Sequence, residues 1–166
     1  MSEYQTMRYV WTHRGNIFMA EPLGAISIGD WNYMFMTYVE GETLARHWPL
    51  LSSKLKSSIL LQLGIILHCL RQIPSPSMHF GSGNPPLCKD LRRHVRTSPG
   101  SIATKEEFNK FLISSDRELN LTYQDLLKSG LRTNHQRVMT HSDLRPENII
   151  VSYTGPDIIS ITRLID

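Results

Sequence analysis

The stretch His141–Asn148, with the sequence HSDLRPEN, decides how the rest of the chain can be interpreted. It connects two short apolar runs, Arg137–Thr140 and Asn148–Tyr153, which both have the composition of β-strands. Asp143 and Asn148 stand on this connection with four residues between them. Asp and Asn are also common in turns, so the same residues could simply cap a loop. The Leu after the Asp and the apolar strand after the Asn favour a reactive site over a plain turn.

The residue types in this stretch suit phosphoryl transfer. Such a reaction needs a carboxylate at the acceptor hydroxyl and oxygen ligands for magnesium, and the kinase signature H-R-D-x-x-x-x-N places its Asp and Asn at this spacing. Asp166 comes at the end of the hairpin that begins at Asn148, where a second metal carboxylate would stand. We therefore predict that Asp143 acts on the acceptor and that Asn148 and Asp166 hold Mg²⁺. His141 is expected to orient the loop backbone.

The loop and the strand after it resemble the motif H-[GS]-D-L-x-P-x-N-[IL]-hydrophobic-V of the aminoglycoside phosphotransferase and choline kinase-like family. The stretch Met36–Leu44, MTYVEGETL, is similar to the hinge of that family, and Leu164–Asp166 resembles the start of its Ile-Ile-Asp-Trp-Glu segment. The stretch Glu106–Asn109 resembles uncharacterised fungal members. The resemblance implies an α+β, protein kinase-like fold that is present in part.

The same resemblance implies the cofactors and the division into lobes. ATP and Mg²⁺ would be the cofactors, and the phosphate acceptor would be a hydroxyl of a small molecule. The backbone at Thr37 and Val39 would bind adenine, and Glu3 would be a candidate for the glutamate that pairs with the ATP-binding lysine. Residues 1–39 would form a remnant N-lobe with a helix and a hairpin, and residues 40–166 a truncated, mainly helical C-lobe.

The chain also departs from the family pattern. It has no lysine before Lys54, which follows the hinge, and the helices that would follow the Asp-Trp-Glu segment are missing. We therefore expect a chain truncated at both ends, in which the acceptor cannot be identified. An inactive, pseudokinase-type module that binds nucleotide or a partner is the alternative, and Mg²⁺-nucleotide binding without turnover would distinguish it.

Composition and charge limit the remaining function classes. The chain has 166 residues, 40% hydrophobic and 20% charged, which is typical of a globular domain and excludes a collagen-like or wholly disordered chain. A net charge of +3 produces only a weak electrostatic field, so nucleic acid is not an expected partner. The basic cluster Lys89–Arg96 leaves a nucleic-acid-binding domain as a minor alternative. That cluster otherwise predicts a solvated loop, or a contact with phosphate or an acidic substrate.

The longest apolar stretch, Ile59–Leu70, is too short to span a membrane and predicts a buried helix. Cys69 and Cys88 match no metal or redox spacing, so we expect a reduced, cytoplasmic protein whose oligomeric state stays open.

Local patterns predict the order of the elements. They are a helix from Ser2 to about His13, a hairpin over Ala25–Val39 around the Gly29-Asp30 turn, a core helix over Ser52–Gln72, an irregular loop over Ser75–Gly100, a helix opened by the Thr104/Glu107 capping box, a helix over Glu118–Ser129 closed by Gly130, a strand over Arg137–Thr140, and a hairpin from Asn148 to Ile165.

Overall fold

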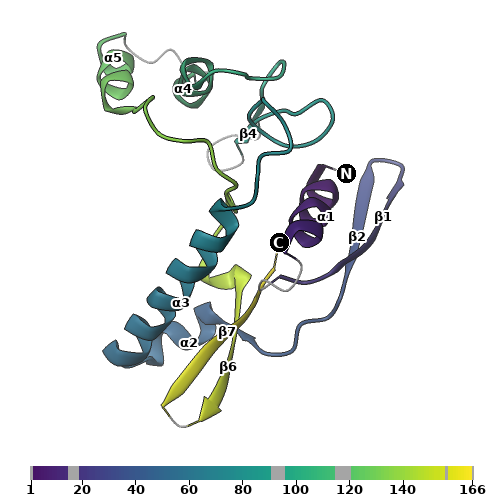
Figure 1. Cartoon of the computed structure of the whole chain (residues 1–166), viewed down its shortest axis with the longest axis vertical. Coiled ribbons are helices and arrows are strands. Elements are labelled where there is room, and N and C mark those ends of the chain that lie inside the picture. The colour runs from purple at the N-terminus through teal and green to yellow at the C-terminus, as the bar shows by residue number, and fades with distance from the viewer. Residues whose placement is uncertain (1, 15–18, 91–95, 115–120, 156, 166) are drawn as a thin grey trace. The chain divides into compact units, whose positions relative to one another are not determined.

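The chain is described by a computed structural model that covers residues 2–14, 19–90, 96–114, 121–155 and 157–165. The chain folds into two compact units (Figure 1). The first unit combines residues 3–74 with residues 138–166, and the second unit spans residues 75–137. The predicted lobe boundary after residue 39 falls inside the first unit and stays a prediction.

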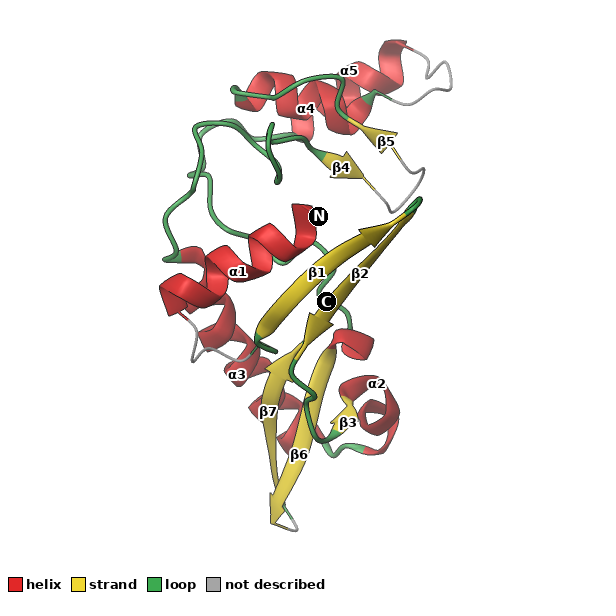
Figure 2. Cartoon of the chain, turned by 90° about the vertical axis from the view of Figure 1, so that its right-hand side faces the viewer, coloured by secondary structure: helices red, strands yellow, loops and turns green. Residues whose placement is uncertain are grey.

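The first unit begins with a helix and a β-hairpin. Helix α1 spans Ser2–Arg14, and strands β1 (Pro22–Ile28) and β2 (Trp31–Met36) pair antiparallel. Gly29 makes the turn with φ 58°, a left-handed value that glycine adopts without steric cost. The predicted helix and hairpin are therefore confirmed, and both are visible in Figure 2.

The predicted hairpin after Asn148 is confirmed as well. Strands β6 (Ile149–Gly155) and β7 (Ile158–Leu164) pair antiparallel, and the two-residue strand β3 (Glu42–Thr43) pairs with the other edge of β6. Helix α2 (Leu44–His47) and the 3-10 turn η1 (Trp48–Leu50) follow β3.

The predicted strand over Arg137–Thr140 is wrong. These residues have no regular secondary structure, although they are as apolar as a short strand. Within the described residues, β6 has β3 on one edge and β7 on the other, so neither of its edges is available to this segment. A strand needs a partner for its backbone groups, and local composition cannot supply one.

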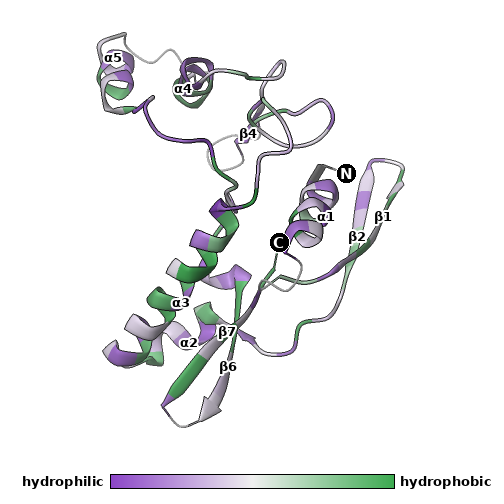
Figure 3. Cartoon of the chain, viewed as in Figure 1, coloured by the Kyte–Doolittle hydropathy of each residue, from purple (hydrophilic) through white to green (hydrophobic). Residues whose placement is uncertain are grey.

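The core of the first unit lies between helix α3 (Ser53–Arg71) and strand β7, and Figure 3 colours much of both elements as hydrophobic. The predicted core helix is confirmed: Ser52 caps it by accepting a hydrogen bond from the N–H of Leu55 at 3.3 Å. The buried core residues are Leu44, Leu51, Ile59, Ile66, Ile149, Val151, Ile159, Ile161 and Leu164.

Gln62, on α3, substitutes for a neighbouring strand along the edge of β7. Its Nε2 donates to the carbonyl oxygen of Ile159 at 3.0 Å, and its Oε1 accepts from the N–H of Ile161 at 2.9 Å. A single side-chain amide thus pairs with a backbone acceptor and a backbone donor of two buried residues, as an adjacent strand would.

We expect Gln62→Leu to lower the free energy of unfolding by about 1–3 kcal/mol, because both backbone groups lose their partner at a buried edge. Urea unfolding measures this change. Leu61→Ala is the control and should change the midpoint little, because Leu61 is 71% exposed. An unchanged midpoint for Gln62→Leu would show that water replaces the amide without cost.

The second unit contains helices α4 (Lys105–Ile113) and α5 (Leu121–Gly130) and the short strands β4 (Lys89–Asp90) and β5 (Arg96–Thr97). The predicted capping box is confirmed: the N–H of Glu107 donates to Thr104 Oγ1 at 3.1 Å, and Glu107 Oε2 accepts from the N–H of Thr104 at 3.2 Å. Backbone N–H groups of Thr104 and Ala103 thereby lower the pKa of Glu107. The predicted start of the next helix, at Glu118, lies outside the described residues.

The stretch Ser75–Gly100 is more ordered than the sequence predicts. Besides the pair of strands β4 and β5, Phe80 bridges to Ile102 and Ser82 bridges to Leu87. Ser98 Oγ accepts a hydrogen bond from the N–H of Cys88 at 3.0 Å and donates to the carbonyl of Gly100 at 2.8 Å. Because these contacts use polar groups without any apolar periodicity, the pattern of the sequence does not reveal them.

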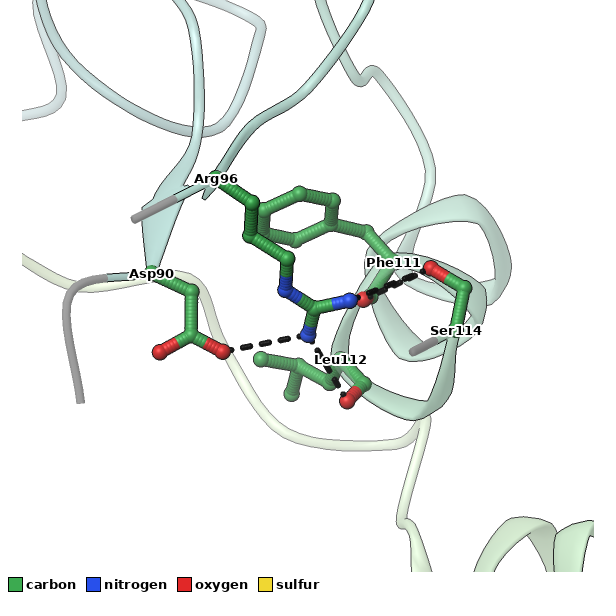
Figure 4. A network of polar contacts seen from close by, with 5 residues as sticks. All are labelled: Asp90, Arg96, Phe111, Leu112 and Ser114. Carbon is green, nitrogen blue, oxygen red and sulfur yellow. Dashed lines mark hydrogen bonds and ion pairs between the residues drawn. The ribbon is translucent and has the colours of Figure 1, made fainter. Parts of the chain in front are cut away.

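Within the basic cluster Lys89–Arg96, the structure describes Lys89, Asp90 and Arg96, and Arg96 points inward rather than to solvent (Figure 4). Its Nη2 donates to Asp90 Oδ2 and to the carbonyl of Leu112, both at 3.1 Å, and its guanidinium lies 4.7 Å from the centre of the Phe111 ring. Arg96 therefore fixes β4 and β5 to helix α4, which corrects the expectation that this arginine is solvated.

We expect Arg96→Ala to lower the free energy of unfolding by about 2–4 kcal/mol, because the 8% exposed Asp90 loses a cationic partner and the carbonyl of Leu112 loses its donor. Arg96→Lys should rescue little, since an ammonium lacks the planar fork that reaches both acceptors. Thermal unfolding monitored by circular dichroism measures the effect, with the exposed Arg132→Ala as control. Equal unfolding midpoints for Arg96→Ala and Arg132→Ala would contradict this reading.

Among the described residues, no helix is long and apolar enough to cross a membrane.

Candidate active site

The loop between Thr140 and strand β6 reverses the chain through two local features. Ser142 has φ 56°, in the left-handed region that favours glycine, which costs a non-glycine residue about 1–2 kcal/mol. Pro146 then opens the 3-10 turn η2 (Pro146–Asn148), closed by a hydrogen bond from the N–H of Asn148 to the carbonyl of Arg145 at 2.9 Å. The strained residue and the proline turn place Asp143 and Asn148 on the same side of the loop.

The structure brings Asp143 and Asn148 into direct contact. Asn148 Nδ2 donates to the carbonyl oxygen of Asp143 at 3.0 Å and to its carboxylate Oδ2 at 3.2 Å. Asn148 is buried, whereas the side chain of Asp143 is 53% exposed. A buried amide therefore holds a carboxylate that solvent and a substrate can reach.

Asp166 lies outside the described residues, so the structure does not place its side chain. Its neighbour Ile165 donates its N–H to the carbonyl of Asn148 at 3.0 Å. Within the described part of the chain, no group of three or more His, Cys, Asp or Glu residues could hold a metal ion. The predicted ligands are instead an amide and a carboxylate, and their role as metal ligands stays a prediction.

The predicted hinge lines a hollow of about 280 Å³. Residues 37–40 form one wall, and Thr162 and Arg163 of β7 form the other. Strand β7 runs on toward Asp166, so Thr37 and Val39 lie beside the strand that leads to the predicted metal site.

Gly41 lets the hinge pass directly over strand β6. Its φ is 129°, and a Cβ at this position would stand 2.7 Å from Ile150 Cγ2 and 2.8 Å from the carbonyl oxygen of Val151. Any side chain would therefore displace β6, the strand that directly follows the loop at His141–Asn148.

The structure leaves two predicted residues without a defined role. His141 is half-buried, and within the described residues its Nδ1 is buried without a hydrogen-bond partner. Glu3 is an exposed residue in the first turn of α1. It stays a prediction that His141 orients the backbone of the loop. It also stays a prediction that Glu3 is the glutamate that pairs with the ATP-binding lysine.

Sequence reasoning missed one residue of this loop, Arg145. Its Nε lies 3.2 Å from Asp143 Oδ2, the same oxygen that accepts from Asn148. The available signal was a basic residue two positions after Asp143 in the sequence.

The model of the phosphotransferase enzyme family matches residues 1–160, which include the hinge and the whole loop at His141–Asn148. The chain belongs to this family. The resemblance to aminoglycoside phosphotransferases and the α+β, partial kinase-like fold are thereby confirmed. Searches of curated proteins and of solved structures found no match to this phosphotransferase-family chain.

Proposed function

We propose that the chain catalyses ATP-dependent phosphorylation of a hydroxyl group on a small molecule. The observation that carries the proposal is the contact between Asp143 and Asn148, in which a buried amide holds an accessible carboxylate at 3.2 Å. Phosphoryl transfer depends mainly on positioning and on charge stabilisation. An accessible carboxylate can orient the acceptor hydroxyl and take its proton.

The donor set around Asn148 suits magnesium, a hard cation that prefers oxygen ligands. Asn148 donates both of its hydrogen bonds to Asp143 from Nδ2. The oxygen of the same amide, Oδ1, takes no part in these two bonds and would be the metal ligand. Asp166 follows Ile165, which is hydrogen-bonded to the backbone of Asn148. Asn148 and Asp166 would hold Mg²⁺, which supplies charge neutralisation at the phosphates when it is bound.

The hollow at the hinge supports adenine binding through backbone groups. The N–H of Thr37 already donates to the carbonyl of Glu21 at 3.0 Å, so Thr37 would contact adenine with its carbonyl oxygen. Val39 would offer its N–H. We propose that the protein acts in the cytoplasm, where ATP is present. Nucleic acid and membrane are not among the proposed partners.

The test is a screen of the purified chain with MgATP against small-molecule alcohols such as amino sugars and amino alcohols. ADP release and the mass of a phosphorylated product are measured, with Asp143→Asn as the inactive control. Product that depends on Asp143 supports the proposal. Binding of MgATP without product for any acceptor favours the non-catalytic nucleotide-binding module instead, and absence of MgATP binding contradicts both.

A further inference from the structure

We propose that the hairpin of β1 and β2 is the interface of a homodimer, in which two copies of this chain pack the same apolar sheet face against each other about a two-fold axis. This inference does not depend on the proposed function. It rests on the register, the exposure and the shape of the hairpin.

The register of the hairpin gathers its large apolar side chains on one face (Figure 2). Directly opposite residues of an antiparallel pair project to the same side, and so do residues two apart along one strand. None of the residues on this face is charged. The face consists of three neighbouring cross-strand pairs, which are, in order from the turn, Ile28 with Trp31, Ile26 with Tyr33, and Gly24 with Phe35.

This face is open to solvent. Trp31 is 72% exposed, and the four other large side chains are between 46% and 61% exposed. The opposite face carries the pairs Ser27 with Asn32 and Ala25 with Met34, of which Ala25 and Met34 are half-buried. A sheet with one solvated face normally turns its polar side chains to water, so the reversed arrangement indicates that the apolar face is covered in solution.

The area of the face suits a dimer. At the exposed fractions given, the three aromatic rings present about 350 Å² of surface, and a monomer rarely leaves a contiguous apolar patch of more than a few hundred Å². The two isoleucines bring the face to about 500 Å², which is more than half of the about 800 Å² that each partner buries in a specific interface. A polar rim normally supplies the remainder.

The shape of the face fits a second copy of itself. Trp31 projects at the end near the turn, whereas Gly24 leaves a depression at the other end, because among the described residues a Cβ there would meet no atom within 4 Å. The pair of Ile26 and Tyr33 lies midway between them. A two-fold axis through this middle pair places Trp31 of each copy over the Gly24 end of the other, so each projection meets a depression.

The chemistry of the face argues against other classes of partner. A nucleic acid, an anionic membrane or an acidic peptide would need basic side chains on the face, and it has none. A flat sheet offers no groove for a helix, whereas two sheet faces pack about 10 Å apart with their strands crossing at about 30°. A second hairpin of the same sequence meets these conditions.

Sedimentation equilibrium of the purified chain between about 1 and 100 μM tests the association. We expect a reversible transition from the mass of one chain to the mass of two. A chain that stays monomeric over this range would overturn the proposal. Assembly beyond the dimer would overturn it as well, because a two-fold interface closes on itself.

Trp31→Thr should raise the Kd of the dimer by about a hundredfold, because each dimer loses two large aromatic side chains from the interface. Threonine keeps a high strand propensity, so the urea midpoint of the monomer should stay unchanged. The matched control is Ile158→Thr, which removes a 58% exposed side chain from strand β7 and should leave the Kd unchanged. Equal Kd values for the two variants would contradict the assignment of the interface to this face.

Gly24→Val separates a fitted interface from unspecific association of apolar surfaces. The space around Gly24 accepts a side chain in the monomer, and its backbone lies outside the left-handed region. The valine would fill the depression that receives Trp31, so we expect the Kd to rise by about tenfold although the variant has more apolar surface. A lower Kd would show unspecific association and overturn the proposed packing.

Discussion

Asp143→Asn is expected to lower the turnover of phosphoryl transfer by about a thousandfold while the Kd of MgATP stays within about twofold of wild type. Asparagine keeps the size of the side chain but cannot accept the proton of the acceptor hydroxyl. In the proposed function the nucleotide is bound at the hinge and by Mg²⁺, so we expect its affinity not to depend on this carboxylate. Single-turnover kinetics with the acceptor and calorimetric titration of MgATP measure the two quantities.

The matched control for this change is Asp157→Asn, which removes an exposed carboxylate in the turn between β6 and β7. It should leave turnover and nucleotide affinity unchanged. Near-normal turnover of Asp143→Asn would remove Asp143 from its assigned role, and an equal loss in both variants would point to the net charge of the chain.

Asn148→Ala is expected to raise the Mg²⁺ concentration for half-maximal activity by about tenfold or more and to lower turnover by about a hundredfold. The variant loses the side-chain oxygen that we propose as a metal ligand and also the amide that holds Asp143, so we expect both metal binding and turnover to suffer. Titration of Mg²⁺ at fixed ATP measures the first effect. Turnover at saturating Mg²⁺ measures the second.

Asn148 is buried, so urea unfolding must accompany these measurements, and Asn134→Ala is the control at an exposed asparagine. Asp166→Ala should shift the Mg²⁺ curve further than Asn148→Ala, because it removes a formal charge from the proposed site. Mg²⁺ curves that coincide with wild type for both variants would show that neither side chain is a ligand.

The sequence by itself determined the features that depend on residues close together in the chain. The loop at His141–Asn148, the turn at Gly29 and the capping box of Thr104 and Glu107 all involve partners within about ten residues. Their spacing therefore predicted their local structure, and the same loop was sufficient to indicate the family. The core helix followed from its apolar period in the same way.

Only the tertiary structure decided the contacts between residues far apart in the sequence. In the sequence, Gln62 only interrupts an apolar helix. In the structure it forms hydrogen bonds with Ile159 and Ile161, which lie 97 and 99 residues away. The sequence predicts a solvated Arg96, whereas in the structure helix α4 supplies a partner for it. The sequence also predicts a strand over Arg137–Thr140, but within the described residues β6 has no free edge to pair with it. The physical reason is that a buried polar side chain and a strand both need a hydrogen-bond partner. When that partner lies far away in the sequence, only the folded chain brings the two together, and the spacing of residues does not predict it.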